Sequence, residues 1–199
     1  MSLQDAQREA VRHAAADLVE VEMASRCRLL GLPQPQADAV RFRALGLDLV
    51  LDLPGFDLRL AEGGASARLG DQLLVLHYLR CAVSPAPTGE PISFRDLPGG
   101  RVYWQPFLSR SIAPLLRAIG NDLERLVRHL DRFDWQPVAA GDLGARIHAL
   151  GRIEATLVYR RGDEEFGPTA ELFFDACIRR VYTTEDVAYL AGRVCLGLL

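Results

Sequence analysis

The segment GDQLLVLHYLRC, residues 70–81, is the most apolar helical stretch of this 199-residue chain. Six of its side chains leave it almost no polar face: Leu73, Leu74, Val75, Leu76, Tyr78 and Leu79. A helix that is apolar on nearly every side is a buried helix. We therefore expect residues 70–81 to lie in the core of the protein.

Short alternating segments precede this helix and predict a small sheet. Apolar and polar residues alternate over 40–44, 47–53 and 56–61, and turn signals at Gly46 and at Pro54-Gly55 separate these runs. Alternation with a period of two is typical of strands that bury one face. The pattern predicts a strand meander.

The last third of the chain predicts a second sheet and a closing helix. The candidate strands are residues 146–150, 153–160 and 171–175, with residues 178–182 as a further candidate. Thr183 or Thr184 suits the N-cap of the closing helix, and Glu185 and Asp186 suit the positive end of its dipole.

The N-terminal region predicts one long amphipathic helix. Apolar residues recur at three- and four-residue steps over residues 3–30, and Gly31 and Pro33 supply the stop. We assign this helix to residues 1–32. The whole pattern predicts an α+β fold in which antiparallel or mixed sheet segments pack with several helices, as a single domain over residues 1–199.

Composition excludes several classes of function. The net charge of −3 and the pI near 5.8 argue against a nucleic-acid partner, because such a surface normally needs a basic field. All 23 basic residues are arginine, so Schiff-base chemistry, pyridoxal phosphate attachment and a P-loop lysine have no ε-amine to use.

The sequence predicts a cytoplasmic protein without a membrane partner. Its apolar runs are too short to span a bilayer, and charges occupy the N-terminal positions where an export signal has its apolar core. The four cysteines lie far apart without a C-x-x-C pair, which indicates reduced and mostly buried thiols. We therefore expect no metal site and no cofactor.

Carboxylates gather in the loop between two candidate strands. Asp163, Glu164 and Glu165 stand together there, and Asp175 follows close behind. Clustered carboxylates can hold a divalent cation or act as a general acid and base, although a solvated hairpin would carry the same residues. Phe166 suggests a tip that is anchored by one buried ring.

Two further candidate sites involve His77 and the segment 93–104. His77, within the apolar helix, suits a general base or a metal ligand, and equally a hydrogen-bonded core histidine. Arg95 suits an anionic ligand, while Tyr103 and Trp104 offer stacking surface for a flat one. The alternative is a turn that packs on its own aromatic residues.

The order of three segments resembles a known family. These segments are LVLHYL at 74–79, PISFRDLPGG at 91–100, and the block that runs from GDEEF at 162–166 through LFFD at 172–175 to TED at 184–186. Together they resemble an uncharacterised prokaryotic family, classed as a domain of unknown function and found largely in anaerobic bacteria and archaea. The resemblance covers residues 38–199.

The resemblance implies a setting rather than a reaction. Some relatives are fused to a cysteine-rich iron–sulfur module of the kind found in corrinoid proteins, whereas this chain has no cysteine cluster. We therefore expect a small-molecule-binding or accessory domain in anaerobic one-carbon or redox metabolism. The alternatives are a protein–protein interaction module that docks to an iron–sulfur or corrinoid partner, and an enzyme that uses His77 with Asp163–Glu165.

Overall fold

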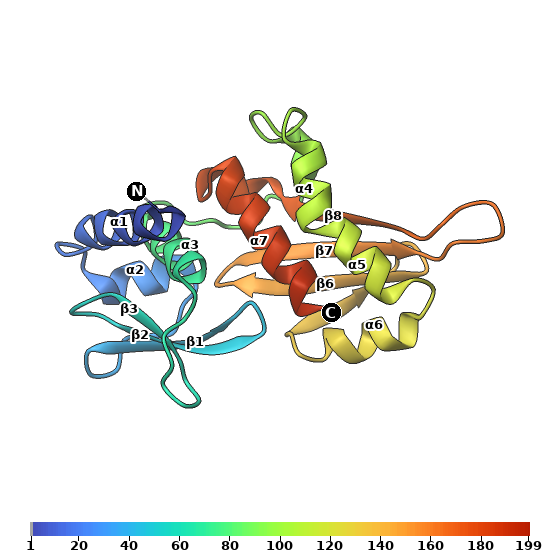
Figure 1. Ribbon diagram of the computed structural model, residues 1–199. Helices are drawn as coiled ribbons and strands as arrows, with labels where there is room; N and C mark the ends of the chain where they lie inside the picture. Colours follow the sequence, from blue (N-terminus) through green and yellow to red (C-terminus); the bar gives the residue numbers. More distant parts are fainter. Residues whose placement is uncertain (1) are drawn as a thin grey trace.

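The predicted apolar helix is α3 (Leu69–Arg80) in the computed structural model, which describes residues 2–199. Its side chains Leu74, Val75, Leu76, Tyr78 and Leu79 are buried, as the sequence predicted. α3 packs against α1 (Leu3–Ala16), α2 (Met23–Leu30) and the final helix α7 (Thr184–Gly197). It thus connects the N-terminal helices with the C-terminal one (Figure 1).

The predicted meander is confirmed as a three-stranded antiparallel sheet. Its strands are β1 (Ala39–Ala44), β2 (Leu47–Asp52) and β3 (Asp57–Leu60), paired in chain order. Leu49, Leu51 and Leu58 are buried on one face of the sheet. This sheet and the helices α1, α2 and α3 form one side of the molecule (Figure 1).

The N-terminal residues form two helices instead of the one long helix that we predicted. α1 ends at Ala16, and α2 begins only after Glu22, whose carboxylate caps the new helix by accepting hydrogen bonds from the backbone of Ala24 and Ser25. The side chain of Leu18 is buried within the intervening turn. Leu18 therefore continues the apolar spacing of α1, although the backbone at Leu18 is no longer helical.

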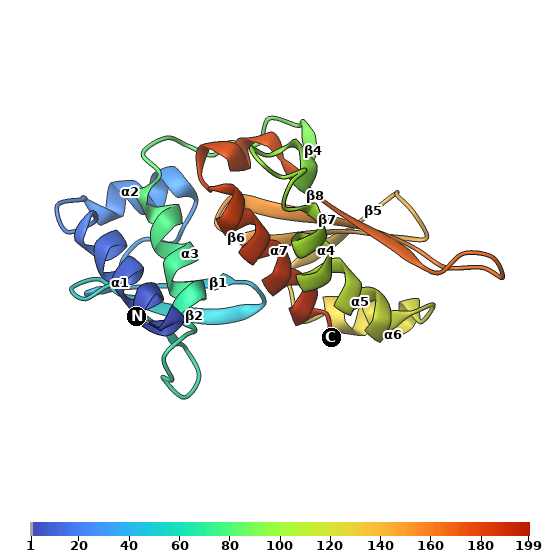
Figure 2. The same ribbon diagram turned by 45° about the horizontal axis from the view of Figure 1, so that its top comes forward.

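The second sheet has five antiparallel strands in the order β4-β8-β7-β6-β5. These strands are β4 (Pro91–Ser93), β5 (Trp135–Val138), β6 (Leu143–Leu150), β7 (Ile153–Arg160) and β8 (Thr169–Asp175). Between β4 and β5 lie α4 (Trp104–Arg110), α5 (Ile112–Ile119) and α6 (Leu123–Leu130). α5 and α7 lie across one face of this sheet (Figures 1 and 2).

Two local features of this region differ from the sequence prediction. Residues 178–182 are not a strand, because residues Ala176–Arg180 form the short 3-10 helix η2, which Asp175 caps through the backbone N–H of Cys177. The edge strands β4 and β5 were not predicted. Each contains a proline, Pro91 or Pro137, which cannot donate to a ladder and is tolerated at a sheet edge.

Direct hydrogen bonds join the two sheets into the single α+β domain that we predicted. The backbone N–H of Leu45, in the β1–β2 turn, donates to the carbonyl oxygen of Ala149 on β6 at 2.8 Å. The hydroxyl of Tyr78 donates to the carbonyl oxygen of Leu30 and accepts from the N–H of Arg152 at 2.8 Å. No helix within residues 2–199 is both long and apolar enough to cross a membrane.

A buried ion pair connects α3 to α7. Asp71, only 1% exposed, accepts two hydrogen bonds from the guanidinium of Arg193, from Nε at 2.6 Å and from Nη2 at 3.0 Å. The hydroxyl of Tyr189 donates to the same carboxylate at 2.9 Å. Burial lowers the pKa of Arg193, but the hydrogen bond and charge of Asp71 outweigh it and keep that pKa raised. The buried guanidinium of Arg193 is therefore kept charged.

We expect Asp71→Asn to lower the free energy of unfolding by about 3–5 kcal/mol, because it leaves the buried guanidinium of Arg193 without a counter-charge. Urea unfolding monitored by circular dichroism measures this change. The control is Glu171→Gln, which breaks an exposed ion pair with Arg160 of 2.9 Å and should cost at most about 1 kcal/mol. Equal losses in the two variants would contradict this role of Asp71.

Candidate functional site

An open hollow of about 440 Å³ lies beside the N-terminus of α4. Its lining side chains, which we call the Arg95 hollow, are Ser93, Arg95, Asp96, Arg101 and Trp104. The wall begins with the short 3-10 helix η1 (Phe94–Asp96), where Ser93 and Asp96 cap each other reciprocally. The chain then turns back so closely that a Cβ atom on Gly100 would lie 2.0 Å from the carbonyl oxygen of Phe94. Glycine is therefore required at that position.

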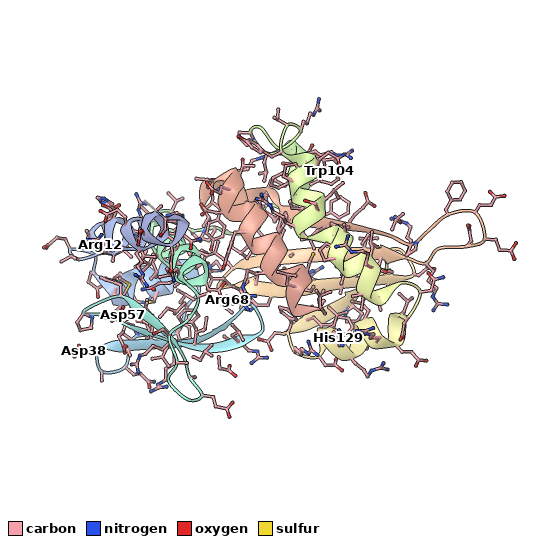
Figure 3. All side chains as sticks on the ribbon, viewed as in Figure 1. Arg12, Asp38, Asp57, Arg68, Trp104 and His129 are labelled. Carbon is pink, nitrogen blue, oxygen red and sulfur yellow. The ribbon has the colours of Figure 1, made fainter. Side chains whose placement is uncertain are left out.

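Aromatic stacking fixes the floor of the Arg95 hollow. The guanidinium of Arg95 lies 4.0 Å from the centre of the Trp104 ring, in a cation–π contact. Trp104 stacks in turn on Phe107 with ring centres 5.3 Å apart, and Phe107 stacks on Phe94 at 4.1 Å. Because Phe94 and Phe107 are buried, the exposed arginine rests on a ring system that is anchored in the core. Figure 3 marks Trp104 on α4.

The Arg95 hollow is positively charged. Within residues 2–199, neither Arg95 nor Arg101 forms a side-chain hydrogen bond or an ion pair. Asp96 carries one negative charge, which cannot neutralise both arginines, and its carboxylate accepts hydrogen bonds from the N–H and the hydroxyl of Ser93. Those two hydrogen bonds are also the main reason why the pKa of Asp96 is lowered. The arrangement thus leaves arginine donors available to an anion.

Tyr103 extends from the same turn into solvent. Its side chain is 61% exposed, and that of the preceding Val102 is 80% exposed. Neither lines the hollow, although both lie beside it in the chain. The turn therefore adds an exposed apolar rim next to the two arginines.

His77 pairs with a carboxylate that the sequence analysis did not connect with it. Its Nδ1 lies 2.9 Å from Oδ1 of Asp186, in the first turn of α7. Asp186 also accepts from the N–H and hydroxyl of Thr183. Burial raises the pKa of Asp186, but the hydrogen bonds from His77 and Thr183 outweigh it and lower that pKa. Because the ionised carboxylate only accepts, Nδ1 of His77 is the donor in this contact.

The loop between β7 and β8, residues 162–167, projects from the body of the protein as a hairpin tip (Figures 1 and 2). Asp163, Glu164 and Glu165 are all exposed there. Oδ1 of Asp163 accepts from the backbone N–H groups of Glu165 and Phe166 at 2.9 and 2.8 Å. Phe166 is 70% exposed, so the expectation of a buried anchoring ring was wrong.

Asp175 holds a loop in place. Its carboxylate accepts from the backbone N–H groups of Thr88, Gly89 and Cys177 and from the hydroxyl of Thr88, at 2.7 to 2.9 Å. Burial raises the pKa of Asp175, but these hydrogen bonds outweigh it and hold that pKa well below its ordinary value. The carboxylate that we had considered as a ligand-binding group is thus engaged within the chain.

A second open hollow, of about 390 Å³, lies over β5, β6 and β7. Its polar side chains include Asp131, Trp135, Arg146, His148 and Glu154. The indole N–H of Trp135 donates to Asp131 at 3.3 Å, Arg146 lies 3.9 Å from Glu154, and Nε2 of His148 lies 2.9 Å from the carbonyl oxygen of Gly151. These groups therefore have partners within the protein, unlike the arginines of the Arg95 hollow.

The thiols and potential metal ligands are dispersed. All four cysteines are free and buried. Burial raises the pKa of Cys27 to about 11 and that of Cys195 to about 12, which keeps both thiols protonated at neutral pH. Within residues 2–199, no three His, Cys, Asp or Glu side chains are grouped so that they could hold a metal ion.

The structure brings together only some of the predicted site residues. Arg95 and Trp104 are in contact, whereas Asp163–Glu165 lie on the hairpin tip, away from both α3 and α4 (Figure 1). The sequence analysis missed Arg101 and Asp186. Arg101 belongs to the segment 93–104 discussed from the sequence. A turn with two glycines separates it from Arg95, and that turn was the sequence signal that the two arginines could lie close together. For the contact between Asp186 and His77, 109 positions apart, no local signal existed.

We expect Asp175→Asn to lower stability at neutral pH, with a difference from the wild type that shrinks as the pH falls. A carboxylate with a depressed pKa in the folded state stabilises the protein above its unfolded pKa of about 4. That contribution is lost progressively as the pH falls from there toward the folded pKa. Urea unfolding midpoints measured from pH 7 to pH 3 test this, and a constant difference would contradict it.

Comparison with known proteins places the chain in a family. A family model described as a domain of unknown function (DUF3786) matches residues 22–196, which adds α2 to the region 38–199 of the resemblance noted from the sequence. No curated protein and no solved structure matches the chain. Because the family match extends over most of the chain, this protein belongs to the DUF3786 family, a domain of unknown function.

Proposed function

We propose that this protein is a small-molecule-binding domain that takes a flat, anionic ligand in the Arg95 hollow. One observation carries the proposal: Arg95 is stacked on Trp104 beside Arg101, and neither guanidinium group forms an ion pair within the described residues. Most exposed arginines lie on flexible stems, whereas Arg95 is held by an aromatic stack that extends to the buried ring of Phe94.

The chemistry of the hollow favours a planar carboxylate. A guanidinium presents a rigid fork of donors that matches the two oxygens of a carboxylate. Arg95 and Arg101 can supply such forks, and the guanidinium of Arg95 already lies over the Trp104 ring. A flat ligand can stack beside these two groups while its carboxylate accepts from the arginine N–H groups. The volume of about 440 Å³ suits a small molecule.

The biological setting is a further part of the proposal. The resemblance to a family of anaerobic prokaryotes suggests a ligand of one-carbon or redox metabolism, with this chain as an accessory domain. Docking to an iron–sulfur or corrinoid protein is the second candidate, and the exposed side chains of Val102 and Tyr103 favour it. The enzyme hypothesis receives less support, because His77 lies on α3 while Asp163–Glu165 lie on the distant hairpin tip (Figure 1).

Ligand binding can be measured through Trp104 itself. The chain has two tryptophans, so Trp135→Phe leaves Trp104 as the only indole. In this background we expect benzoate, as a planar carboxylate probe, to change the fluorescence of Trp104 saturably. Arg95→Ala should weaken benzoate binding about tenfold or more, because a hydrogen bond to a charged group contributes about 1.5–3 kcal/mol. Inorganic phosphate, which has no flat face, should bind more weakly than benzoate.

The matched control is Arg117→Ala, which removes an exposed arginine on α5 outside the hollow. This variant should bind benzoate with the affinity of the Trp135→Phe parent. The absence of a saturable response in the parent, or equal affinities for Arg95→Ala and Arg117→Ala, would contradict the proposed function.

A further inference from the structure

The hairpin tip, residues 162–167, combines an exposed aromatic ring with carboxylates. Phe166 is 70% exposed, and the adjacent Glu164 and Glu165 are exposed as well. Within the described residues, neither glutamate forms an ion pair or a side-chain hydrogen bond. The ring of Phe166 contributes nothing to the core and is therefore available for a contact outside the fold.

Hydrogen bonds hold the backbone at the base of the hairpin tip in place. The side-chain amide of Asn121 donates to the carbonyl oxygen of Gly162 at 3.0 Å and accepts from its N–H at 2.8 Å. Asp163 closes the turn by accepting from the backbone of Glu165 and Phe166, while its own N–H donates to the Phe166 carbonyl oxygen at 2.8 Å. The backbone of such a tip therefore loses little conformational entropy when the tip binds.

The Arg95 hollow has the complementary properties. It offers the unpaired guanidinium groups of Arg95 and Arg101, and the exposed apolar side chains of Val102 and Tyr103 lie beside it in the chain. Arginine forks match the glutamate carboxylates of the tip, and the apolar rim matches the Phe166 ring. The charges on the two surfaces are of opposite sign, which favours their association.

The two surfaces cannot meet within one chain as it is folded. In both ribbon views the hairpin tip extends away from the body beyond the ends of β7 and β8, while the hollow lies at the N-terminal end of α4 (Figures 1 and 2). Both surfaces are nevertheless carried by every copy of the chain. A second copy is therefore the partner that always supplies the matching surface.

We propose that the hairpin tip of one copy docks into the Arg95 hollow of a second copy. When the tip of each copy occupies the hollow of the other, no tip and no hollow is left open. The expected assembly is therefore a closed dimer with two-fold symmetry. This inference rests on the proposed function, because the same arginines receive the tip carboxylates and the planar carboxylate ligand. The ligand and the partner's tip then compete, so ligand binding shifts the protein toward the monomer.

Sedimentation velocity of the full chain over a wide range of concentrations tests the association. We expect a shift from monomer to dimer as the concentration rises, and a weaker dimer at high salt, because exposed charges are screened. The variant Phe166→Ser combined with Glu165→Gln should remain monomeric under the same conditions. A wild-type chain that stays monomeric throughout, or a tip variant that dimerises like the wild type, would overturn the proposal.

A charge exchange identifies the contacting surfaces. One chain carries Arg95→Glu and Arg101→Glu, and the other carries Glu164→Arg and Glu165→Arg. Each alone places like charges at both contacts and should be monomeric, whereas an equal mixture restores opposite charges at both contacts and should dimerise. All four positions are exposed, and unchanged urea midpoints confirm that both variants fold. A mixture that remains monomeric would contradict this pairing of surfaces.

The failure of the dimer and the failure of ligand binding are distinguishable. The chain with Phe166→Ser and Glu165→Gln keeps the Arg95 hollow intact, so benzoate binding to it, read from Trp104 in the Trp135→Phe background, depends only on the proposed function. If this chain binds benzoate and the wild type does not dimerise, only the docking proposal is wrong. If the wild type dimerises but no chain binds benzoate, the small-molecule function is wrong.

Discussion

The ion pair between Asp71 and Arg193 is the interaction on which the arrangement of the molecule depends. It joins the start of α3 to the end of α7, while His77 and Asp186 join the opposite ends of the same two helices. α7 in turn fixes the wall of the Arg95 hollow, because the hydroxyl of Thr184 donates to the carbonyl oxygen of Pro98 at 2.8 Å. A pair buried this deeply must be satisfied completely, which favours one relative position of the helices over others.

Periodicity in the sequence was sufficient to predict the meander, the apolar helix and the closing helix, because each buries a regular face. It failed where the backbone turns without a break in apolar spacing. Leu18 lies in a turn yet continues the helical pattern, and Ile178 and Tyr182 are buried from a 3-10 helix and the residues after it rather than from a strand. Asp71 gave no sign of its importance, because its partner Arg193 stands 122 positions away.

The same distinction applies to the candidate site. Arg95 and Trp104 were predicted as a group because a single glycine-containing turn brings them together. His77 and Asp163–Glu165 were combined in one hypothesis although their relative positions depend on the packing of distant elements, and the fold separates them. Asp186 was explained by its role at the helix start, and that role remains, since Thr183 and Asp186 cap each other. Its second contact, with His77, required the tertiary structure.

We have proposed that a stacked arginine and its neighbour bind a planar carboxylate in a family without an assigned activity. The most direct measurement follows the two indole N–H resonances of ¹⁵N-labelled protein during a titration with benzoate. We expect the Trp104 resonance to move saturably while that of Trp135, in the other hollow, stays in place. A Trp104 resonance that does not move, or equal movement of both, would contradict the proposal.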